Sequence, residues 1–224
     1  MGFKMKNLNQ LIIKFDYEQN FKDQDFYVSK SNEYSFKLLS SWPKWEKNFL
    51  NLIGEKFSGK SHLVNIFLKK FKGIKINASE INNQTLKDIK ICENIIIENL
   101  DDNIDENLFF TLLNIIDQDN KFLIVTSVKS IVEISFKLND LNSRSKNFLL
   151  SYIERPDDEL MFALILKNLS DRQISIDKKL IDYIIKRIDR SYSKIFDFIY
   201  KIDEISLKRK KSIDFKIIKE VLGE

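Results

Sequence analysis

The stretch that decides the fold of this chain is Gly54-Glu55-Lys56-Phe57-Ser58-Gly59-Lys60-Ser61, which matches G-x-x-x-x-G-K-[ST] at every fixed position. Such a loop wraps its backbone N–H groups around a phosphate, and glycine allows the tight turns that this requires. Lys60 is predicted to contact the β- and γ-phosphates, and the Ser61 hydroxyl to bind Mg²⁺. The chain of 224 residues has only five glycines, so a chance match is rare and the stretch predicts a nucleotide-binding phosphate loop.

The segments on either side of this loop supply the context that it needs. Residues 48–53 are typical of a short buried strand, and residues 60–71 have apolar side chains at helical spacing. A helix that follows the loop points its positive amino end at the bound anion. The residues predicted to bind the nucleotide here are Gly54, Phe57, Ser58, Gly59, Lys60, Ser61 and His62.

Further along, strands and helices alternate as far as residue 153. Continuous apolar runs such as Ile95–Ile97 are typical of parallel strands that are buried on both faces. The predicted strands are 48–53, 74–76, 94–98, 122–127 and 148–153, and the predicted helices between them are 60–71, 82–89 and 106–116. This alternation predicts a three-layer α/β base, residues 25–153, around a parallel sheet.

The pattern changes after Pro156, where only helical stretches remain. They are predicted at 157–169, 177–188, 194–205 and 214–222. Residues 154–224 are therefore expected to form a small all-α subdomain. Residues 1–24 are polar apart from one apolar island, and we expect them to be a flexible tail.

The overall composition excludes several classes of protein. The 37 basic and 33 acidic residues are mixed along the chain, so the net charge of +4 does not indicate a nucleic-acid-binding surface. One cysteine cannot form an internal disulfide, and one histidine cannot form a His-rich metal site. Since no run of eighteen apolar residues occurs, we expect a cytoplasmic protein without a membrane span.

Polar residues at the ends of two predicted strands complete the predicted nucleotide site. Glu98 ends one strand and is the expected carboxylate of the Mg²⁺ shell, while Thr126 and Ser127 end another and can place a hydroxyl near the γ-phosphate. The next residue is Asn99, and an amide cannot accept a proton from the attacking water. We therefore expect nucleotide binding without fast hydrolysis. Asp101 and Asp102 are interpreted as a solvated loop.

Taken together, these segments resemble the AAA+ module of the DnaA family. The resemblance lies in residues 54–64 with His62 after the serine, in residues 25–32, in residues 138–144 and in two stretches of the helical part, 153–163 and 208–222. It implies a P-loop AAA+ base followed by a helical lid. It also implies that Asn32 lies at the adenine pocket, that Arg144 is the arginine finger, and that Mg²⁺ and ATP or ADP are the cofactors.

One departure concerns the lid arginine that senses the nucleotide in this family. Its position corresponds to Ser193, and Lys194 lies one residue further on. A lysine can partly replace the arginine as a point charge, without its forked geometry. Glu55 stands where the family often has proline.

Within the family, the chain resembles the Hda group of regulators. Residues 10–15, Gln-Leu-Ile-Ile-Lys-Phe, resemble a sliding-clamp-binding peptide in which Gln10 bonds at the pocket rim. Leu11, Ile13 and Phe15 would fill an apolar pocket, and such anchors carry most of the binding energy. The chain ends at Glu224, where an initiator of the family continues into a helix-turn-helix domain. The expectation is therefore a clamp-tethered, nucleoid-associated regulator that contacts DNA through the clamp.

In the Hda group, the clamp-bound protein meets a DnaA-type initiator and promotes hydrolysis of the initiator's ATP in trans. Carried over, this role falls to Arg144. Alternatives remain open: Arg144 as a surface residue, the tail peptide as a segment docked on its own domain, an active ATPase or helicase-loader-like motor, and a nucleotide-stabilised scaffold. The choice between ATP and ADP, and assembly into homo-oligomers, also stay open.

Overall fold

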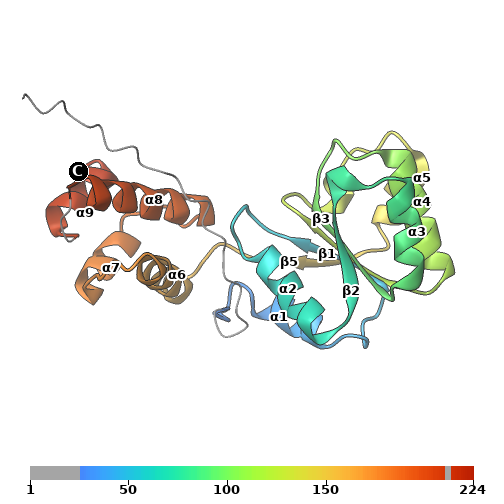
Figure 1. Cartoon of the computed structure of the whole chain (residues 1–224), viewed down its shortest axis with the longest axis horizontal. Coiled ribbons are helices and arrows are strands. Elements are labelled where there is room, and N and C mark those ends of the chain that lie inside the picture. The colour runs from blue at the N-terminus through green and yellow to red at the C-terminus, as the bar shows by residue number, and fades with distance from the viewer. Residues whose placement is uncertain (1–25, 210–212) are drawn as a thin grey trace, which may run out of the picture.

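The five strands of the protein form one sheet, as the computed structural model of residues 26–209 and 213–224 shows (Figure 1). The strands are β1 (Phe49–Ile53), β2 (Gly73–Asn77), β3 (Asn94–Leu100), β4 (Phe122–Ser127) and β5 (Leu149–Tyr152). Their order is β2-β3-β4-β1-β5, and each pair is parallel. Ile53, the last residue of β1, lies opposite Ser127 of β4 and Tyr152 of β5. The loop after β1 therefore starts between the carboxyl ends of two neighbouring strands.

Helices cover both faces of the sheet and make the base a three-layer structure (Figure 1). They are α1 (Glu33–Ser40), α2 (Lys60–Lys70), α3 (Asn83–Asp88), α4 (Glu106–Gln118) and α5 (Asn139–Ser145), with 3-10 turns at Ala78–Glu80, Ile89–Ile91 and Ile131–Glu133. On β3, Ile96 packs in one apolar cluster with Leu63 and Phe67 of α2, whereas Ile95 packs in the other with Phe109 of α4. This alternation places α2 and α4 on opposite faces, as the period of a strand requires.

Four helices form the lid: α6 (Asp158–Asp171), α7 (Lys178–Ile185), α8 (Tyr192–Arg209) and α9 (Phe215–Leu222). An aspartate stands before three of them and caps the first turn, namely Asp157 before α6, Asp177 before α7 and Asp214 before α9. The lid has its own apolar core, but Tyr192 of α8 and Leu160 of α6 pack in the base cluster beside α2. The amino ends of α6 and α8 therefore lie against the base.

The predicted fold class, an α/β AAA+ base with a helical lid, is confirmed, and the differences are local. Helix α1 was not expected, because its eight residues bury only Ser35 and Leu39. Ser35 Oγ lies 2.8 Å from Ser151 Oγ of β5, so a distant strand stabilises this helix. Strand β3 runs two residues beyond Glu98, with an irregular register between Ile97 and Leu100.

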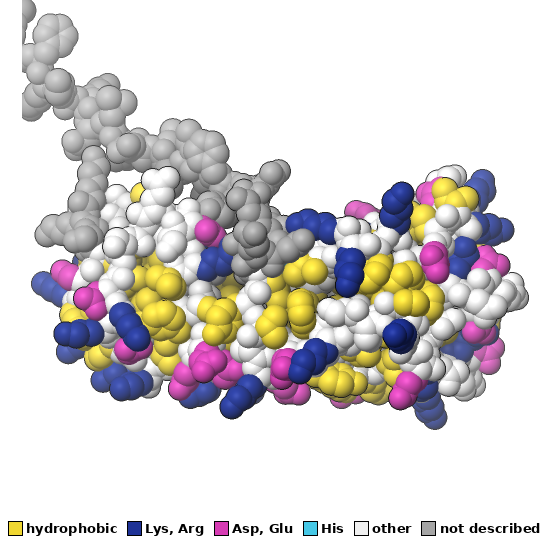
Figure 2. Space-filling model, turned by 90° about the horizontal axis from the view of Figure 1, so that it is seen from below, with side chains coloured by type: hydrophobic (Ala, Val, Ile, Leu, Met, Phe, Trp, Pro, Cys, Tyr) yellow, Lys and Arg dark blue, Asp and Glu magenta, His cyan; other side chains and the backbone are white. Residues whose placement is uncertain are grey.

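On one face of the molecule, charged side chains of both signs are mixed, as they are in the sequence. Figure 2 shows Lys and Arg interspersed with Asp and Glu, among hydrophobic side chains, on the face of the molecule that it draws. In the part of the chain that the structure describes, no helix is both long and apolar enough to span a membrane.

Candidate nucleotide site

The phosphate loop connects β1 to α2 and depends on both of its fixed glycines. Gly59 has φ +93°, a left-handed conformation that side chains disfavour, and precedes the first residue of α2. A Cβ added to Gly54 would lie 2.6 Å from Ser58 Oγ and 3.2 Å from Ile153 Cβ. Gly54 N–H also donates to Ser127 O at 3.2 Å, which ties the loop to the end of β4.

Lys60 is the buried cation of this loop. Its Nζ donates to the Gly54 carbonyl at 2.7 Å and to the Glu55 carbonyl at 2.9 Å. Burial lowers the pKa of Lys60 to about 8, although the negative charges of Glu55 and Glu98 oppose that shift. Burial disfavours the charged ammonium, and a nearby anion would favour it again. A phosphate beside Lys60 would therefore form a strong, charge-assisted hydrogen bond with the ammonium. Glu98, near the end of β3, is thus close enough for its charge to act on Lys60.

Two buried oxygens at the site lack partners among the described residues. They are Ser58 Oγ in the loop and Glu98 Oε1 on β3. The other carboxylate oxygen of Glu98 pairs with Lys75 Nζ of β2 at 3.2 Å. Buried polar atoms are normally hydrogen-bonded, so each of these oxygens has unused capacity for a ligand. A carboxylate and the Ser61 hydroxyl are oxygen donors of the kind that Mg²⁺ prefers, and the residues present therefore fit this metal.

Thr126 and Ser127 of β4 are buried, and each hydroxyl accepts a hydrogen bond from a neighbouring strand. Thr126 Oγ1 accepts from Asn99 N–H at 3.1 Å, and Ser127 Oγ accepts from Asn51 Nδ2 at 2.9 Å. Asn99 has φ +59°, so this hydrogen bond supports a left-handed residue beside Glu98. The role of the two hydroxyls toward a γ-phosphate stays a prediction.

Asn51 is a residue of the site that sequence reasoning missed. It is fully buried in β1, donates to Val125 O and Ser127 Oγ, and accepts from Ile131 N–H at 2.8 Å. Its side chain thereby joins the end of β4 to the segment that follows it. The available signal was a single amide inside the apolar run of residues 49–53.

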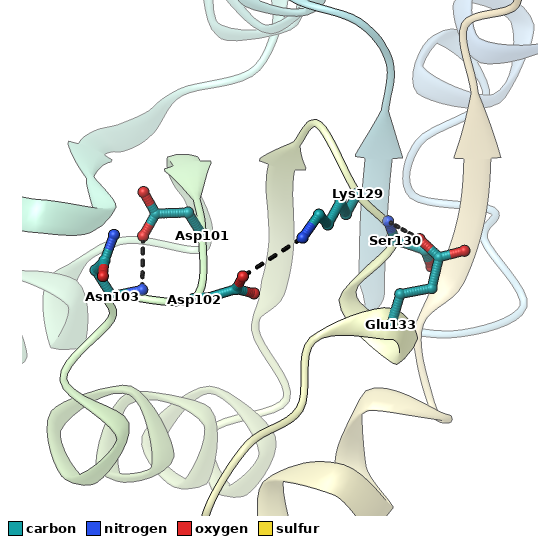
Figure 3. A network of polar contacts seen from close by, with 6 residues as sticks. All are labelled: Asp101, Asp102, Asn103, Lys129, Ser130 and Glu133. Atoms are coloured by element: carbon teal, nitrogen blue, oxygen red, sulfur yellow. Dashed lines mark hydrogen bonds and ion pairs between the residues drawn. The ribbon is translucent and has the colours of Figure 1, made fainter.

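Asp101 and Asp102 lie in the loop after β3 and are held there by other partners (Figure 3). Asp101 Oδ1 accepts from the backbone N–H of Asn103 at 2.8 Å, and Asp102 pairs with Lys129 at 3.5 Å. Both aspartates are exposed. These contacts agree with a solvated loop and give neither carboxylate a position at the phosphate loop.

The segment before α1 lies against the phosphate loop. Phe26 packs edge-on against His62 with ring centroids 5.3 Å apart, and a Cβ at Gly59 would lie 3.2 Å from the Phe26 ring. Asn32 is buried, with Oδ1 accepting from Ser29 N–H and Nδ2 donating to Tyr27 O. Both ends of its amide thus shape the 26–32 loop, and its predicted place at an adenine pocket stays a prediction.

The lid contributes the first turn of α8. Ser193 N–H donates to the Glu55 carboxylate at 3.2 Å, while Lys194 is exposed on the same turn. Tyr192 is buried, and its hydroxyl donates to Glu154 O at 3.0 Å. Burial, together with the nearby negative charges of Asp157, Glu55 and Glu154, raises the pKa of Tyr192, which keeps this hydroxyl protonated.

Arg144 lies away from the phosphate loop. It is in the last turn of α5, where its guanidinium is 3.5 Å from Asp117 of α4 and 5.4 Å from the Phe110 ring centre. In a parallel α/β sheet the covering helices run against the strands, so the end of α4 and the end of α5 lie toward the amino ends of the strands. The phosphate loop lies at the opposite, carboxyl edge. The predicted clamp peptide, with Gln10, lies outside the described residues.

The strand order, the phosphate loop after β1 and the helical lid together define the AAA+ class of P-loop proteins. Residues 157–222 match the family model described as "Hda, lid domain". The chain is 24% identical over 225 residues to the chromosomal replication initiator protein DnaA of a Thermoanaerobacter species. That alignment covers 89% of this chain and 51% of the DnaA protein. The chain is also 24% identical over 188 residues to an uncharacterized protein of Haemophilus influenzae, covering 78% of this chain and 81% of that one.

Solved structures agree on the fold. Domain III of the Thermotoga maritima replication initiation protein DnaA superposes with a TM-score of 0.74 at 16% identity, covering 92% of this chain and 97% of that one. AMPPCP-bound DnaA from Aquifex aeolicus gives 0.67 at 18% identity, covering 86% and 70%. The chain is thus similar in sequence to DnaA proteins, shares the AAA+ fold of DnaA domain III, and matches the Hda lid model over its helical part. It spans about half the length of the curated DnaA proteins that it matches.

Proposed function

We propose that this protein is a nucleotide-bound regulator of replication initiation that acts on a DnaA-type initiator in trans. The observation that carries the proposal is that two groups lie at opposite ends of the strands. The phosphate loop lies at the carboxyl ends, and Arg144 lies toward the amino ends. An arginine so placed cannot serve its own loop, but it can reach a loop in a partner protein. The similarity to DnaA proteins supports a DnaA-type initiator as the partner.

Adenine nucleotide binding is supported by the intact loop and by the AMPPCP found in the related Aquifex aeolicus structure. Lys60 would balance the phosphate charge, and the glycines leave room for close approach of the backbone. Mg²⁺ would be held through Ser61 and, by way of water, Glu98, where it neutralises phosphate charge. Since Asn99 follows Glu98, this chain offers an amide where a base for the attacking water would stand, and we expect slow hydrolysis.

Replacing Glu98 with glutamine is expected to weaken the dependence of nucleotide affinity on Mg²⁺. Groups that hold a metal through water typically contribute about 10–100-fold to metal affinity, and Gln retains the shape without the charge. The measurement is a titration with a fluorescent ADP analogue in Mg²⁺ and in EDTA. Glu93→Gln, an exposed carboxylate just before β3, is the matched control. If the ratio of affinity in Mg²⁺ to affinity in EDTA is the same for Glu98→Gln as for the unchanged protein, Glu98 does not belong to the metal site.

The tail supplies the proposed tether to the sliding clamp. Gln10, Leu11, Ile13 and Phe15 would bind the clamp and bring Arg144 to an initiator near newly replicated DNA. The protein would then meet DNA, and the nucleoid, through the clamp.

Removing the tether is expected to abolish clamp-dependent stimulation while sparing the fold. The experiment measures ATP hydrolysis by the cognate initiator with clamp loaded on DNA, and compares the unchanged chain with Gln10→Ala/Leu11→Ala. Apolar anchors dominate peptide affinity, so this variant should stimulate no more than a reaction without clamp. Asn7→Ala, in the same tail, is the matched control. Equal stimulation by both variants would refute the tether.

A second candidate function is an active AAA+ motor. It is favoured by the complete phosphate loop and by Glu98. The Thermotoga maritima RuvB branch migration motor shares the fold, with a TM-score of 0.67 at 13% identity. Turnover separates the two functions. Hydrolysis of many ATP per second by the isolated protein would favour the motor over the regulator.

A further inference from the structure

Glu55 of the phosphate loop contacts the lid directly. Its carboxylate accepts hydrogen bonds from the Ser191 hydroxyl, from Tyr192 N–H at 3.1 Å and from Ser193 N–H at 3.2 Å. Tyr192 and Ser193 open α8, and the first N–H groups of a helix have no acceptor within the helix. Glu55, a residue of the base, therefore caps a helix of the lid. In the sequence, Glu55 and Ser191 are 136 positions apart.

Phe57, two residues further along the loop, makes a second contact with the same helix. Its ring stacks on Phe196 of α8 with centroids 4.9 Å apart and an angle of 28°. Phe57 has φ +68°, a conformation that is costly for a residue with a side chain, so the surroundings must hold it. The loop that would bind the nucleotide thus contacts α8 at two points, through hydrogen bonds accepted by Glu55 and through the ring of Phe57.

The charge of Glu55 acts on the same group that would bind phosphate. Glu55 and Glu98 are the two carboxylates whose negative charge favours the ammonium form of Lys60. Burial raises the pKa of Glu55, but hydrogen bonds from Ser191, Ser193 and Tyr192 outweigh it and hold that pKa below its ordinary value. Glu55 is therefore ionised at neutral pH. A polyphosphate at Lys60 would bring further negative charge toward this carboxylate, and like charges at short range repel.

We propose that Glu55 couples nucleotide binding to the position of the lid: the carboxylate holds α8 on the base, and phosphate in the loop weakens that hold. This inference rests on the proposed nucleotide binding at the loop. Since coupling between two equilibria is reciprocal, the grip on α8 must in turn lower the affinity of the loop for nucleotide. Glu55 is thus a positioning residue for the lid and sets the affinity of the site.

The first test measures affinity for a fluorescent ADP analogue in Glu55→Gln. This substitution removes the charge and keeps an oxygen acceptor, so affinity should rise by about 5-fold or more, the lower part of the usual range for coupled sites. Glu154→Gln removes the same charge from an exposed residue at the junction of base and lid and should leave affinity unchanged. Damage to the fold would lower affinity, so a rise cannot come from misfolding, and the distance measurement below separates the lid from a direct charge effect.

The second test measures the distance between base and lid without reference to affinity. Spin labels are placed on the exposed positions of Lys47→Cys and Lys201→Cys, in a Cys92→Ser background because Cys92 is the one cysteine of the chain. Pulsed dipolar spectroscopy should give a narrow distribution for the unchanged loop and a broader one when ADP and Mg²⁺ are added. Glu55→Ala should give the broad distribution without ADP, and ADP should add nothing.

The outcomes separate this inference from the proposed function. Two results would refute the coupling and leave nucleotide binding intact. One is equal nucleotide affinity of Glu55→Gln and Glu154→Gln, and the other is a narrow distance distribution in Glu55→Ala. Failure of the unchanged protein to bind ATP or ADP would refute the proposed function, and the coupling with it. A rise in affinity for Glu55→Gln together with a broad distribution for Glu55→Ala supports the coupling.

Discussion

Replacing Arg144 with alanine is expected to abolish stimulation of the initiator's ATPase while leaving the protein folded, nucleotide-bound and clamp-bound. A guanidinium offers forked donors and spreads charge over the transferring phosphoryl group. In other NTPases such a finger raises the rate by about 10³–10⁵-fold, so stimulation should fall to the background. The measurement is single-turnover hydrolysis of ATP by the cognate initiator, with clamp loaded on DNA.

The contacts of Arg144 make this variant interpretable. Its ion pair with Asp117 joins side chains that are 28% and 63% exposed, and pairs of this kind contribute under about 1 kcal/mol to stability. The melting temperature should therefore change little. Lys146→Ala, an exposed cation two residues away, is the matched control, and Arg144→Lys should recover only part of the activity because lysine is a point charge. Full stimulation by Arg144→Ala would exclude this arginine as the finger.

Replacing Lys60 with alanine is expected to lower nucleotide affinity by roughly 10- to 100-fold. A hydrogen bond to a charged group contributes about 1.5–3 kcal/mol, and each 1.4 kcal/mol is about tenfold in affinity. Affinity for a fluorescent ADP analogue, measured by titration, checks the expectation. Lys56→Ala is the matched control, because Lys56 is an exposed lysine of the same loop. Equal losses in the two variants would mean that net charge, and not Lys60, holds the phosphates.

The pKa of Lys60 adds a pH signature to this prediction. Burial lowers that pKa to about 8, and bound phosphate would raise it again, so the free protein loses the ammonium at a lower pH than the complex. Binding is then accompanied by proton uptake above pH 8, and affinity should fall as pH rises through about 8. Lys60→Arg should remove this slope, since a guanidinium keeps its proton throughout. A slope that persists in Lys60→Arg would have to arise elsewhere.

Features that depend on neighbouring residues were predictable. The phosphate loop is eight consecutive residues whose conformation follows from two glycines, and the structure places it between β1 and α2 as expected. The apolar run of β4 was predicted with its bounds intact, because a strand buried on both faces has no polar interruption. The aspartates before the lid helices likewise cap their own first turns. The resemblance to DnaA proteins, which rests on such local motifs, is confirmed by the comparisons.

Features that depend on residues far apart in the sequence were decided by the tertiary structure alone. Helix α1 is short, and it is stabilised by the packing of Leu39 in the α2 cluster and by the bond between Ser35 and Ser151. Asn51 gained a role when β4 was placed beside β1. Glu55, a minor departure from the family pattern in the sequence, became the cap of α8 once the lid had folded back onto the base.

The sequence by itself therefore determined that this protein has a phosphate loop, a parallel α/β base and a helical lid, because local propensities and hydrophobic periodicity specify each element from within. Only the tertiary structure decided which distant groups contact one another. It placed the Glu55 carboxylate on α8 and paired Arg144 with Asp117, away from the phosphate loop. The physical reason is that a hydrogen bond or ion pair acts over a few ångströms, and only the packed fold brings distant parts of the chain that close.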